Sequence, residues 1–475
     1  MNASILRLFV LVTILFTLLV AWTSRWTVFQ QEELQDNALN RRELLEEQRI
    51  RRGPIRARDG TLLARSVEGK AGTFSRRYPT GELFSHPLGY SFLTVGRSGL
   101  EQERNDELTG EEDAVTSIVD QLSGKDPEGD VVRTTLDPQA QRVALQALGG
   151  RRGAVVAIEP RTGKVRVMAS VPTFDPNRLR EERSLAALEN GSALNRATQG
   201  QYPPGSTFKV VTAVAAIDSG RYTKDSQVDG PSPKTISGAP LANSGGQDFG
   251  VIPLTTALTN SVNTVWAEVG EELGGAIMGR YMRRFGFYEK VEIDVPAEER
   301  SASGVRVQGR DGFVRPTSDR VDVGRMAIGQ GGLLTTPLQM AMVAAAVAND
   351  GELMKPTLVD RIVDRDGRTV DEPAGEEMAR VMKTSTAREV GDMMANVVRE
   401  GTGTAAALQG IPVAGKTGTA EIDPATDLNQ PWFIAFAPRE RPKIAIAVTI
   451  ERSQGGQGGT VAAPVAKQVL EELLG

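Results

Sequence analysis

The chain has 475 residues, of which 24% are charged and 40% hydrophobic, and its formal net charge is −5 at pH 7. This length allows a catalytic domain with a smaller module beside it, and the balanced charge argues against intrinsic disorder and against a nucleic-acid partner. The sequence has no cysteine and one histidine, His86, which excludes thiolate nucleophiles, disulfides and multi-histidine metal sites. We interpret His86 as a packing residue, and in a nucleophilic enzyme we expect Lys, Asp or Glu to act as the base.

The first 26 residues predict a membrane anchor. An apolar run extends from Leu8 to Ala21, a length that suits a short spanning helix or the apolar region of a signal peptide. Two tryptophans and an arginine follow at positions 22–26, typical of the membrane interface, and we find no small-residue cleavage site. We therefore predict an uncleaved single-pass anchor over residues 1–26.

Two segments separate this anchor from the remainder of the chain. Residues 27–50 are charged and nearly free of glycine and proline, which predicts a helical stalk that ends before Gly53-Pro54. Residues 51–150 are rich in turns, with short apolar stretches and no cluster of catalytic side chains. We interpret them as a spacer or docking module.

The third part, residues 151–475, begins with predicted strands and returns to strands before a last helix. Residues 154–170 predict a β-hairpin, helical patterns dominate residues 206–347, and the stretches VAGKTGTAEI, WFIAFAP and KIAIAVTI between residues 413 and 450 are apolar and β-branched. Pro464 opens a last helix. This order predicts an α+β domain rather than alternating βαβ units.

Residues 410–420 read GIPVAGKTGTA, which matches the nucleotide-binding loop G-x-x-x-x-G-K-[ST]. That loop requires a helix to open at Lys416-Thr417, whereas Gly418 follows at once and the alternation across residues 413–422 predicts a strand. We also find no apolar strand that ends in a magnesium-binding aspartate. The sequence therefore predicts that no nucleotide binds here.

A candidate nucleophile lies at Ser206, where the turn YPPG meets an apolar helix, and Lys209 follows three residues later. Residues at i and i+3 share a helix face, so the lysine amine can reach the serine hydroxyl. A desolvated lysine beside another cation can lose enough proton affinity to act as a base. The alternative is an N-cap followed by a solvated lysine, since S-x-x-K is a common pattern.

Two later stretches could complete such a site. Ser261-Val262-Asn263 lies at a predicted break between two helices, where a hydroxyl and an amide can project together, or where an ordinary N-cap would lie. Lys416-Thr417-Gly418 lies on the predicted strand, followed by Thr419. A glycine in mid-strand often marks the close approach of another backbone or of a ligand.

In this order, S-x-x-K, S-x-N and K-T-G resemble the active-site triplet of penicillin-binding proteins and serine β-lactamases. The stretches RGPIRARDGTLLA, RRYPTGELFSHPLGY, GAVVAIEPRTGKV, YPPGSTFKVVTA and AIGQGGLLTTPLQMAMVAAAVANDGE also resemble class B penicillin-binding proteins, the monofunctional peptidoglycan transpeptidases. The resemblance extends from residue 51 to the end and is greatest to the compact members. About 100 residues before the catalytic part leave no room for the glycosyltransferase of bifunctional class A proteins.

The resemblance implies a penicillin-binding/serine β-lactamase-like fold, with an antiparallel sheet flanked by helices and a helical subdomain. It implies that Ser206 attacks the penultimate D-Ala carbonyl of a D-Ala-D-Ala stem peptide and forms an acyl-enzyme. Lys209 would take the serine proton, Ser261 would relay it to the leaving amine, and Lys416 would complete the hydrogen-bonded network.

The same resemblance implies the substrate contacts. Asn263 would bind the peptide amide, and Thr417, Gly418 and Thr419 would form the substrate-binding strand, with the two hydroxyls on the terminal carboxylate. The N–H groups of Ser206 and Thr419 would form the oxyanion hole.

The resemblance implies no cofactor, metal or nucleotide. The expected ligands are peptidoglycan stem peptides and β-lactams, the expected partner is a polytopic membrane glycosyltransferase of the SEDS type, and the catalytic domain would be extracytoplasmic, as the missing cysteines also allow. A penicillin-binding sensor or scaffold, or a D,D-carboxypeptidase that gives the acyl group to water, would share these motifs.

Overall fold

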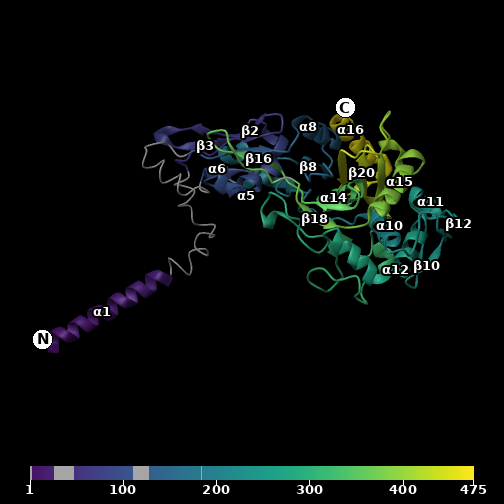
Figure 1. The fold of residues 1–475 in the computed structure, drawn as a ribbon, viewed down its shortest axis with the longest axis horizontal. Coiled ribbons are helices and arrows are strands. Elements are labelled where there is room, and N and C mark those ends of the chain that lie inside the picture. The colour runs from purple at the N-terminus through teal and green to yellow at the C-terminus, as the bar shows by residue number, and fades with distance from the viewer. Residues whose placement is uncertain (1–2, 26–47, 111–127, 183–184, 374) are drawn as a thin grey trace.

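The computed structural model describes residues 3–25, 48–110, 128–182, 185–373 and 375–475 (Figure 1). Most of the predicted stalk, residues 27–50, lies outside the described residues.

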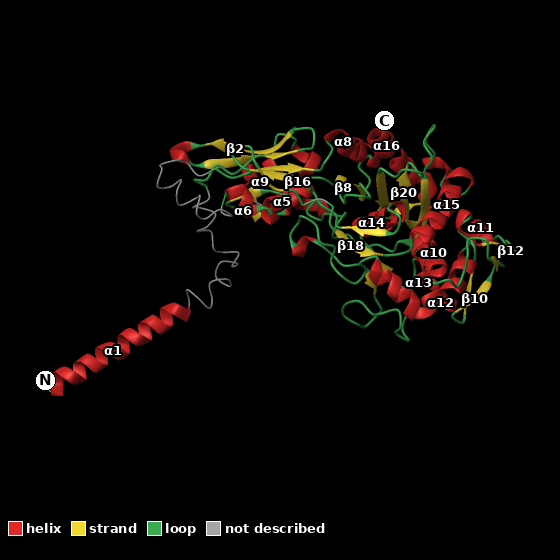
Figure 2. Ribbon diagram, viewed as in Figure 1, coloured by secondary structure: helices red, strands yellow, loops and turns green. Residues whose placement is uncertain are grey.

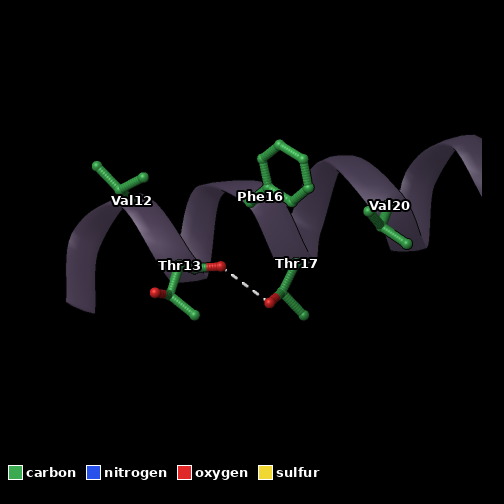
Figure 3. Close-up of a pocket in the computed structure, with 5 residues that line it drawn as sticks. All are labelled: Val12, Thr13, Phe16, Thr17 and Val20. Atoms are coloured by element: carbon green, nitrogen blue, oxygen red, sulfur yellow. Dashed lines mark hydrogen bonds between the residues drawn. The ribbon is translucent and has the colours of Figure 1, made fainter. Parts of the chain in front are cut away.

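Helix α1 (Ala3–Ser24) is apolar and its side chains are exposed. Its residues Ile5–Ser24 have a mean hydropathy of 2.5, a length and composition that a spanning helix shares with a signal sequence. Two threonine hydroxyls bond back to carbonyls of the same helix: Thr13 donates to Phe9 O and Thr17 to Thr13 O, each at 2.9 Å, and Figure 3 shows the second of these bonds. The helix therefore carries these hydroxyls without an unmet hydrogen bond, as a hydrocarbon environment requires.

A mixed six-stranded sheet, of order β17-β16-β6-β1-β2-β3, forms the N-terminal module. Its strands are β1 (Ile55–Arg56), β2 (Leu62–Glu68), β3 (Phe74–Arg77), β6 (Val131–Thr134), β16 (Val359–Val363) and β17 (Thr369–Asp371). Strand β16 pairs antiparallel with β6, so residues 359–371 lie beside strands more than 200 residues earlier in the chain (Figure 1). The module of residues 51–150 therefore shares its sheet with a later segment.

His86 lies in this module and is buried. Its ring packs edge-on against Phe174, and Nε2 donates to Ser192 O at 2.8 Å. Burial lowers the pKa of the imidazole to about 4. The interpretation of His86 as a packing residue is confirmed.

A second, antiparallel sheet carries the C-terminal part of the chain in the order β19-β20-β21-β7-β8. Its strands are β7 (Gly153–Ile158), β8 (Val165–Val171), β19 (Ala414–Asp423), β20 (Leu428–Ala437) and β21 (Ile444–Ile450), with β22 (Ser453–Gln454) paired to β20. The predicted hairpin and the three C-terminal strands are confirmed. Strand β19 runs through the lysine-glycine motif at the edge of the sheet, so the predicted strand through residues 413–422 is confirmed and no helix opens at Lys416-Thr417.

Helices cover both faces of this sheet (Figure 2). Alternate residues of β7 belong to different cores: Val155 and Ala157 pack with helices α8 (Pro138–Leu148) and α16 (Ala463–Leu474), whereas Ala154 and Val156 pack with α10 (Lys209–Asp218) and α14 (Pro337–Ala348). Successive side chains point to opposite faces of a strand, so burial on both faces requires the continuous apolar runs seen in the sequence. Helix α15 (Thr384–Glu400) lies against β19.

The helical subdomain of residues 219–336 contains α11 (Leu254–Thr259), α12 (Asn263–Arg284) and α13 (Val323–Ala327). It also contains three strand pairs: β9 (Gln227–Asp229) with β12 (Val251–Pro253), β10 (Lys234–Ile236) with β11 (Ala239–Leu241), and β13 (Gly304–Val305) with β14 (Leu333–Leu334). The remaining elements are α4 (Ser85–Leu88), α5 (Gly99–Glu103), α6 (Asn105–Thr109), α9 (Pro176–Glu182), β4 (Ser91–Phe92), β5 (Gly96–Arg97), β15 (Glu352–Met354) and β18 (Glu377–Arg380). The α+β class predicted from the order of the elements is confirmed.

Candidate active site

The turn before Ser206 packs tightly on strand β19. After Pro204, residues Gly205–Phe208 form one turn of 3-10 helix that continues into α10. Gly205 has φ +53°, and a Cβ added there would lie 2.9 Å from Ala420 N, so this position requires glycine. Ser206 is half-buried, and its hydroxyl makes no hydrogen bond within the described part of the chain.

Gly418 is the counterpart of Gly205 on the strand. A Cβ added at Gly418 would lie 2.7 Å from Pro204 O and 3.0 Å from Thr207 N. The predicted close approach at this glycine is therefore present, and the approaching backbone is the turn that carries Ser206. Any side chain at Gly418 would push the two segments apart.

Lys209 is fully buried, and its amine reaches the S-x-N turn rather than Ser206. Nζ donates to Ser261 O at 2.8 Å and to Asn263 Oδ1 at 2.7 Å, and lies 3.2 Å from Ser261 Oγ. The expected direct contact between Lys209 and Ser206 does not appear among the hydrogen bonds of this structure. The physical reason is that a buried amine needs acceptors, and the carbonyl and amide oxygens of residues 261 and 263 supply them.

Ser261 lies between α11 and α12 with φ +57°, a left-handed conformation that costs a non-glycine residue about 1–3 kcal/mol. Its hydroxyl lies between two lysines, because Lys416 Nζ donates to Ser261 Oγ at 2.9 Å from the other side. The strained backbone thus places one hydroxyl between two buried amines.

Both amines have lowered proton affinity. Burial lowers the pKa of Lys416 to about 7. Burial, and then the charge of Lys416, lower the pKa of Lys209 well below its usual value of 10.5. The lowered pKa favours the neutral Lys209 amine, which can accept a proton, and Ser261 Oγ gives that proton a path toward Lys416.

The predicted substrate-binding side chains line the same region. Asn263 Nδ2 donates to Ala242 O at 3.2 Å, which fixes the amide with its oxygen on Lys209. Thr417 is buried, and the half-buried Thr419 accepts at Oγ1 from Gly458 N at 3.1 Å. The eight residues singled out from the sequence therefore lie on three segments: the start of α10, the α11–α12 turn and strand β19.

Sequence reasoning missed the residues that support the nucleophile turn. The Tyr202 hydroxyl donates to Glu451, whose Oε1 also accepts from Arg196 Nε at 2.9 Å. The Trp432 indole donates to Pro203 O at 3.0 Å. These groups come from distant parts of the sequence, and only the position of Tyr202 directly before the Pro-Pro-Gly turn could have pointed to one of them.

Within the described ranges, no group of three or more His, Asp or Glu side chains is placed to hold a metal ion. The lysine of the apparent nucleotide motif points its amine at Ser261 and Thr417 O, the latter at 2.9 Å. Its geometry is that of a partner to the serine, not of a phosphate ligand.

Two family models match the chain. One, described as the penicillin binding protein transpeptidase domain, matches residues 153–471, and the other, described as the penicillin binding protein A dimerisation domain, matches residues 52–132. The chain is similar over its whole length to the peptidoglycan D,D-transpeptidases PbpA of Mycolicibacterium smegmatis (34% identity) and Mycobacterium tuberculosis (33% identity), each aligned over 99% of its own length.

Solved structures give the same picture. The penicillin G acyl-enzyme complex of penicillin-binding protein A from M. tuberculosis is similar with a TM-score of 0.79 and 32% identity, over 90% of this chain and all of that one. Pseudomonas aeruginosa PBP2, in complex with WCK 5153, is similar with a TM-score of 0.73 and 28% identity, over 89% of this chain and 95% of that one.

Proposed function

Because the chain belongs to the penicillin-binding protein transpeptidase family, we propose that it is a peptidoglycan D,D-transpeptidase whose acyl-enzyme forms on Ser206. The family assignment confirms the resemblance inferred from the motifs. The observation that carries the proposal is the position of Ser261 Oγ, 3.2 Å from Lys209 Nζ and 2.9 Å from Lys416 Nζ, with the half-buried Ser206 one turn before Lys209 at the start of α10.

In the acylation step, Ser206 Oγ forms a bond to the penultimate D-Ala carbonyl carbon as Lys209 takes its proton. The peptide C–N bond then breaks, and the leaving D-Ala amine takes a proton relayed through Ser261. The N–H groups of Ser206 and Thr419 would stabilise the oxyanion, at roughly 3 kcal/mol per donor. An amine of a neighbouring stem peptide then attacks the ester, the cross-link forms, and the proton returns to Ser206.

Substrate binding would use the other predicted residues. Asn263 would hold the peptide amide, while Thr417 and Thr419, with Gly418 between them, would face the terminal carboxylate. The cationic form of Lys416 would attract the same carboxylate. A β-lactam, which carries a carboxylate and a strained amide, would acylate Ser206 by the same steps.

Ser206→Ala should abolish labelling by a fluorescent penicillin while the fold is retained, because a half-buried hydroxyl without a hydrogen bond contributes little to packing. Lys209→Ala should lower the rate by about 10²- to 10⁴-fold, the usual contribution of a general base. Ser219→Ala, at the other end of α10, is the matched control and should label normally. Mass spectrometry should place the adduct on Ser206, and an adduct on Ser261 would refute the assignment.

Two other functions would use the same site, namely a sensor or scaffold that is only acylated, and a D,D-carboxypeptidase. Incubation with a D-Ala-D-Ala donor and an amine acceptor separates them. A transpeptidase yields the cross-linked product, a carboxypeptidase yields only the shortened peptide, and a sensor yields neither although penicillin labels it.

We further propose the boundaries 1–26 for the anchor, 27–50 for the stalk, 51–150 for the N-terminal module and 151–475 for the transpeptidase domain, with the last outside the membrane. Helix α1 is long enough to cross a membrane. The expected substrate, peptidoglycan, lies outside the membrane, and this supports placing the transpeptidase domain on that side. A membrane-impermeant fluorescent penicillin should label intact cells that express the chain. Labelling that requires lysis would place the domain inside.

The N-terminal module would dock a polytopic membrane glycosyltransferase of the SEDS type. The match of residues 52–132 to a dimerisation-domain model supports a binding role for this module. Because the chain has no cysteine, a single introduced cysteine gives a site-specific cross-link. Val67→Cys on the exposed side of β2 should cross-link to such a glycosyltransferase, and Lys443→Cys on the transpeptidase domain should not.

A further inference from the structure

Thr402, which sequence analysis did not single out, contacts the predicted carboxylate-binding strand. It follows α15 and Gly401, and its Oγ1 lies 2.6 Å from Thr417 Oγ1. Neither hydroxyl has another hydrogen-bond partner within the described part of the chain. The two threonines therefore form an isolated hydroxyl pair beside Lys416.

The backbone holds Thr402 firmly in this place. A Cβ added at Gly401 would lie 2.3 Å from Thr259 O, at the end of α11, and a Cβ added at Gly459 would lie 2.5 Å from Thr402 O. Thr402 N also donates to Thr259 O at 3.4 Å. Thr402 therefore lies between the segment that leads to Ser261 and the helical turn Gly458–Ala462 before α16.

A hydroxyl has one proton to donate, whereas an ionised carboxylate can only accept. If Thr417 donated to Thr402, a bound carboxylate would face the lone pairs of Thr417 Oγ1. If Thr402 donates, the single proton of Thr417 is available for the carboxylate. The second arrangement makes a charge-assisted hydrogen bond, and the bond from Thr402 strengthens it by polarising Thr417.

We propose that Thr402 is a positioning residue that donates its hydroxyl proton to Thr417 Oγ1 and so directs the Thr417 proton to the carboxylate of the substrate or β-lactam. The inference rests on the proposed role of Thr417 in the transpeptidase site. It assigns Thr402 a function in carboxylate recognition and none in the transfer of the acyl group.

The test compares penicillin G with its methyl ester, which lacks the charged carboxylate but keeps the β-lactam. In Thr402→Val, which keeps the shape and loses the hydroxyl, Thr417 loses the donor that orients and polarises it, and the second-order rate constant of acylation by penicillin G should fall about fivefold, the size of one ordinary hydrogen bond. The rate with the methyl ester should change less than about twofold, within the usual error of additivity. Thr402→Ser should remain close to wild type with both ligands.

Equal losses with acid and ester, an unchanged rate with penicillin G, or a loss in Thr402→Ser as large as in Thr402→Val would each overturn the inference. If Thr402→Val does not fold, Thr402→Ala carries the same comparison. In a Thr417→Ala background, Thr402→Val should cause no further loss with penicillin G. Failure of the wild-type protein to react with either ligand would instead contradict the proposed function itself.

Discussion

Replacing Lys416 by methionine should stabilise the transpeptidase domain while it slows acylation. The Lys416 side chain is fully buried, and burial lowers its pKa from 10.5 to about 7. The unfolded chain therefore binds this proton more tightly than the folded one. At about 1.4 kcal/mol per pH unit, the difference destabilises the fold by roughly 4 kcal/mol at pH 7.

The amine also contributes favourable contacts that methionine lacks. Its hydrogen bonds to Ser261 Oγ and Thr417 O are both 2.9 Å. Ser261 Oγ would keep its contact with Lys209 Nζ at 3.2 Å, so the loss of the two Lys416 bonds costs about 2 kcal/mol in total. The net gain for Lys416→Met is then about 2 kcal/mol at pH 7. In a domain of this size that corresponds to a rise in melting temperature of about 3 °C.

The pH dependence has a defined sign. The penalty is complete below the folded pKa of about 7, declines between pH 7 and 10.5, and is absent above 10.5, where the unfolded chain also loses the proton. Thermal unfolding of both proteins at pH 6, 7 and 9.5 should therefore show an advantage for Lys416→Met that shrinks as the pH rises. Lys443→Met, on an exposed lysine at the start of β21, is the control and should show no such trend. A variant that is less stable at every pH, or more stable by the same amount at every pH, would refute the reasoning.

Two further outcomes follow from the same contacts. The affinity for penicillin G should weaken as the pH rises through about 7, because neutral Lys416 no longer attracts the carboxylate. Saturation kinetics at each pH separate the affinity from the acylation rate. A constant affinity from pH 6 to 8.5 would contradict this role of Lys416. Gly418→Ala should lower acylation about 100-fold with the circular dichroism spectrum retained, because its methyl group would lie 2.7 Å from Pro204 O and displace the Ser206 turn by a fraction of an ångström or more. Wild-type acylation in that variant would show that the packing of this turn on β19 does not set the site geometry.

The parts of the fold that local sequence predicts are those with long apolar runs. Strands β7, β8, β20 and β21 are buried along most of their length, so their sequences are largely apolar and stand out from the surrounding turns. Strand β19 is predicted from the alternation of its residues, since it carries polar side chains and its C-terminal end is exposed. The strand pairs of the helical subdomain have two or three residues each, too few to show an alternation. The pairing of β16 with β6 depends on contacts between distant segments, which no local pattern records.

The hydrogen bonds of the site likewise depend on contacts between distant segments, which local sequence does not record. Helical spacing correctly places Lys209 one turn after Ser206, but the spacing alone says nothing about acceptors from other elements. A buried amine at Lys209 is stabilised by oxygens of Ser261 and Asn263, and these come from a turn 52 to 54 residues later. Ser206 is consequently left without a hydrogen bond. In the proposed mechanism, Ser206 could therefore turn toward an arriving carbonyl without first breaking a contact, while Lys209, Ser261 and Lys416 would already be held in place to move its proton.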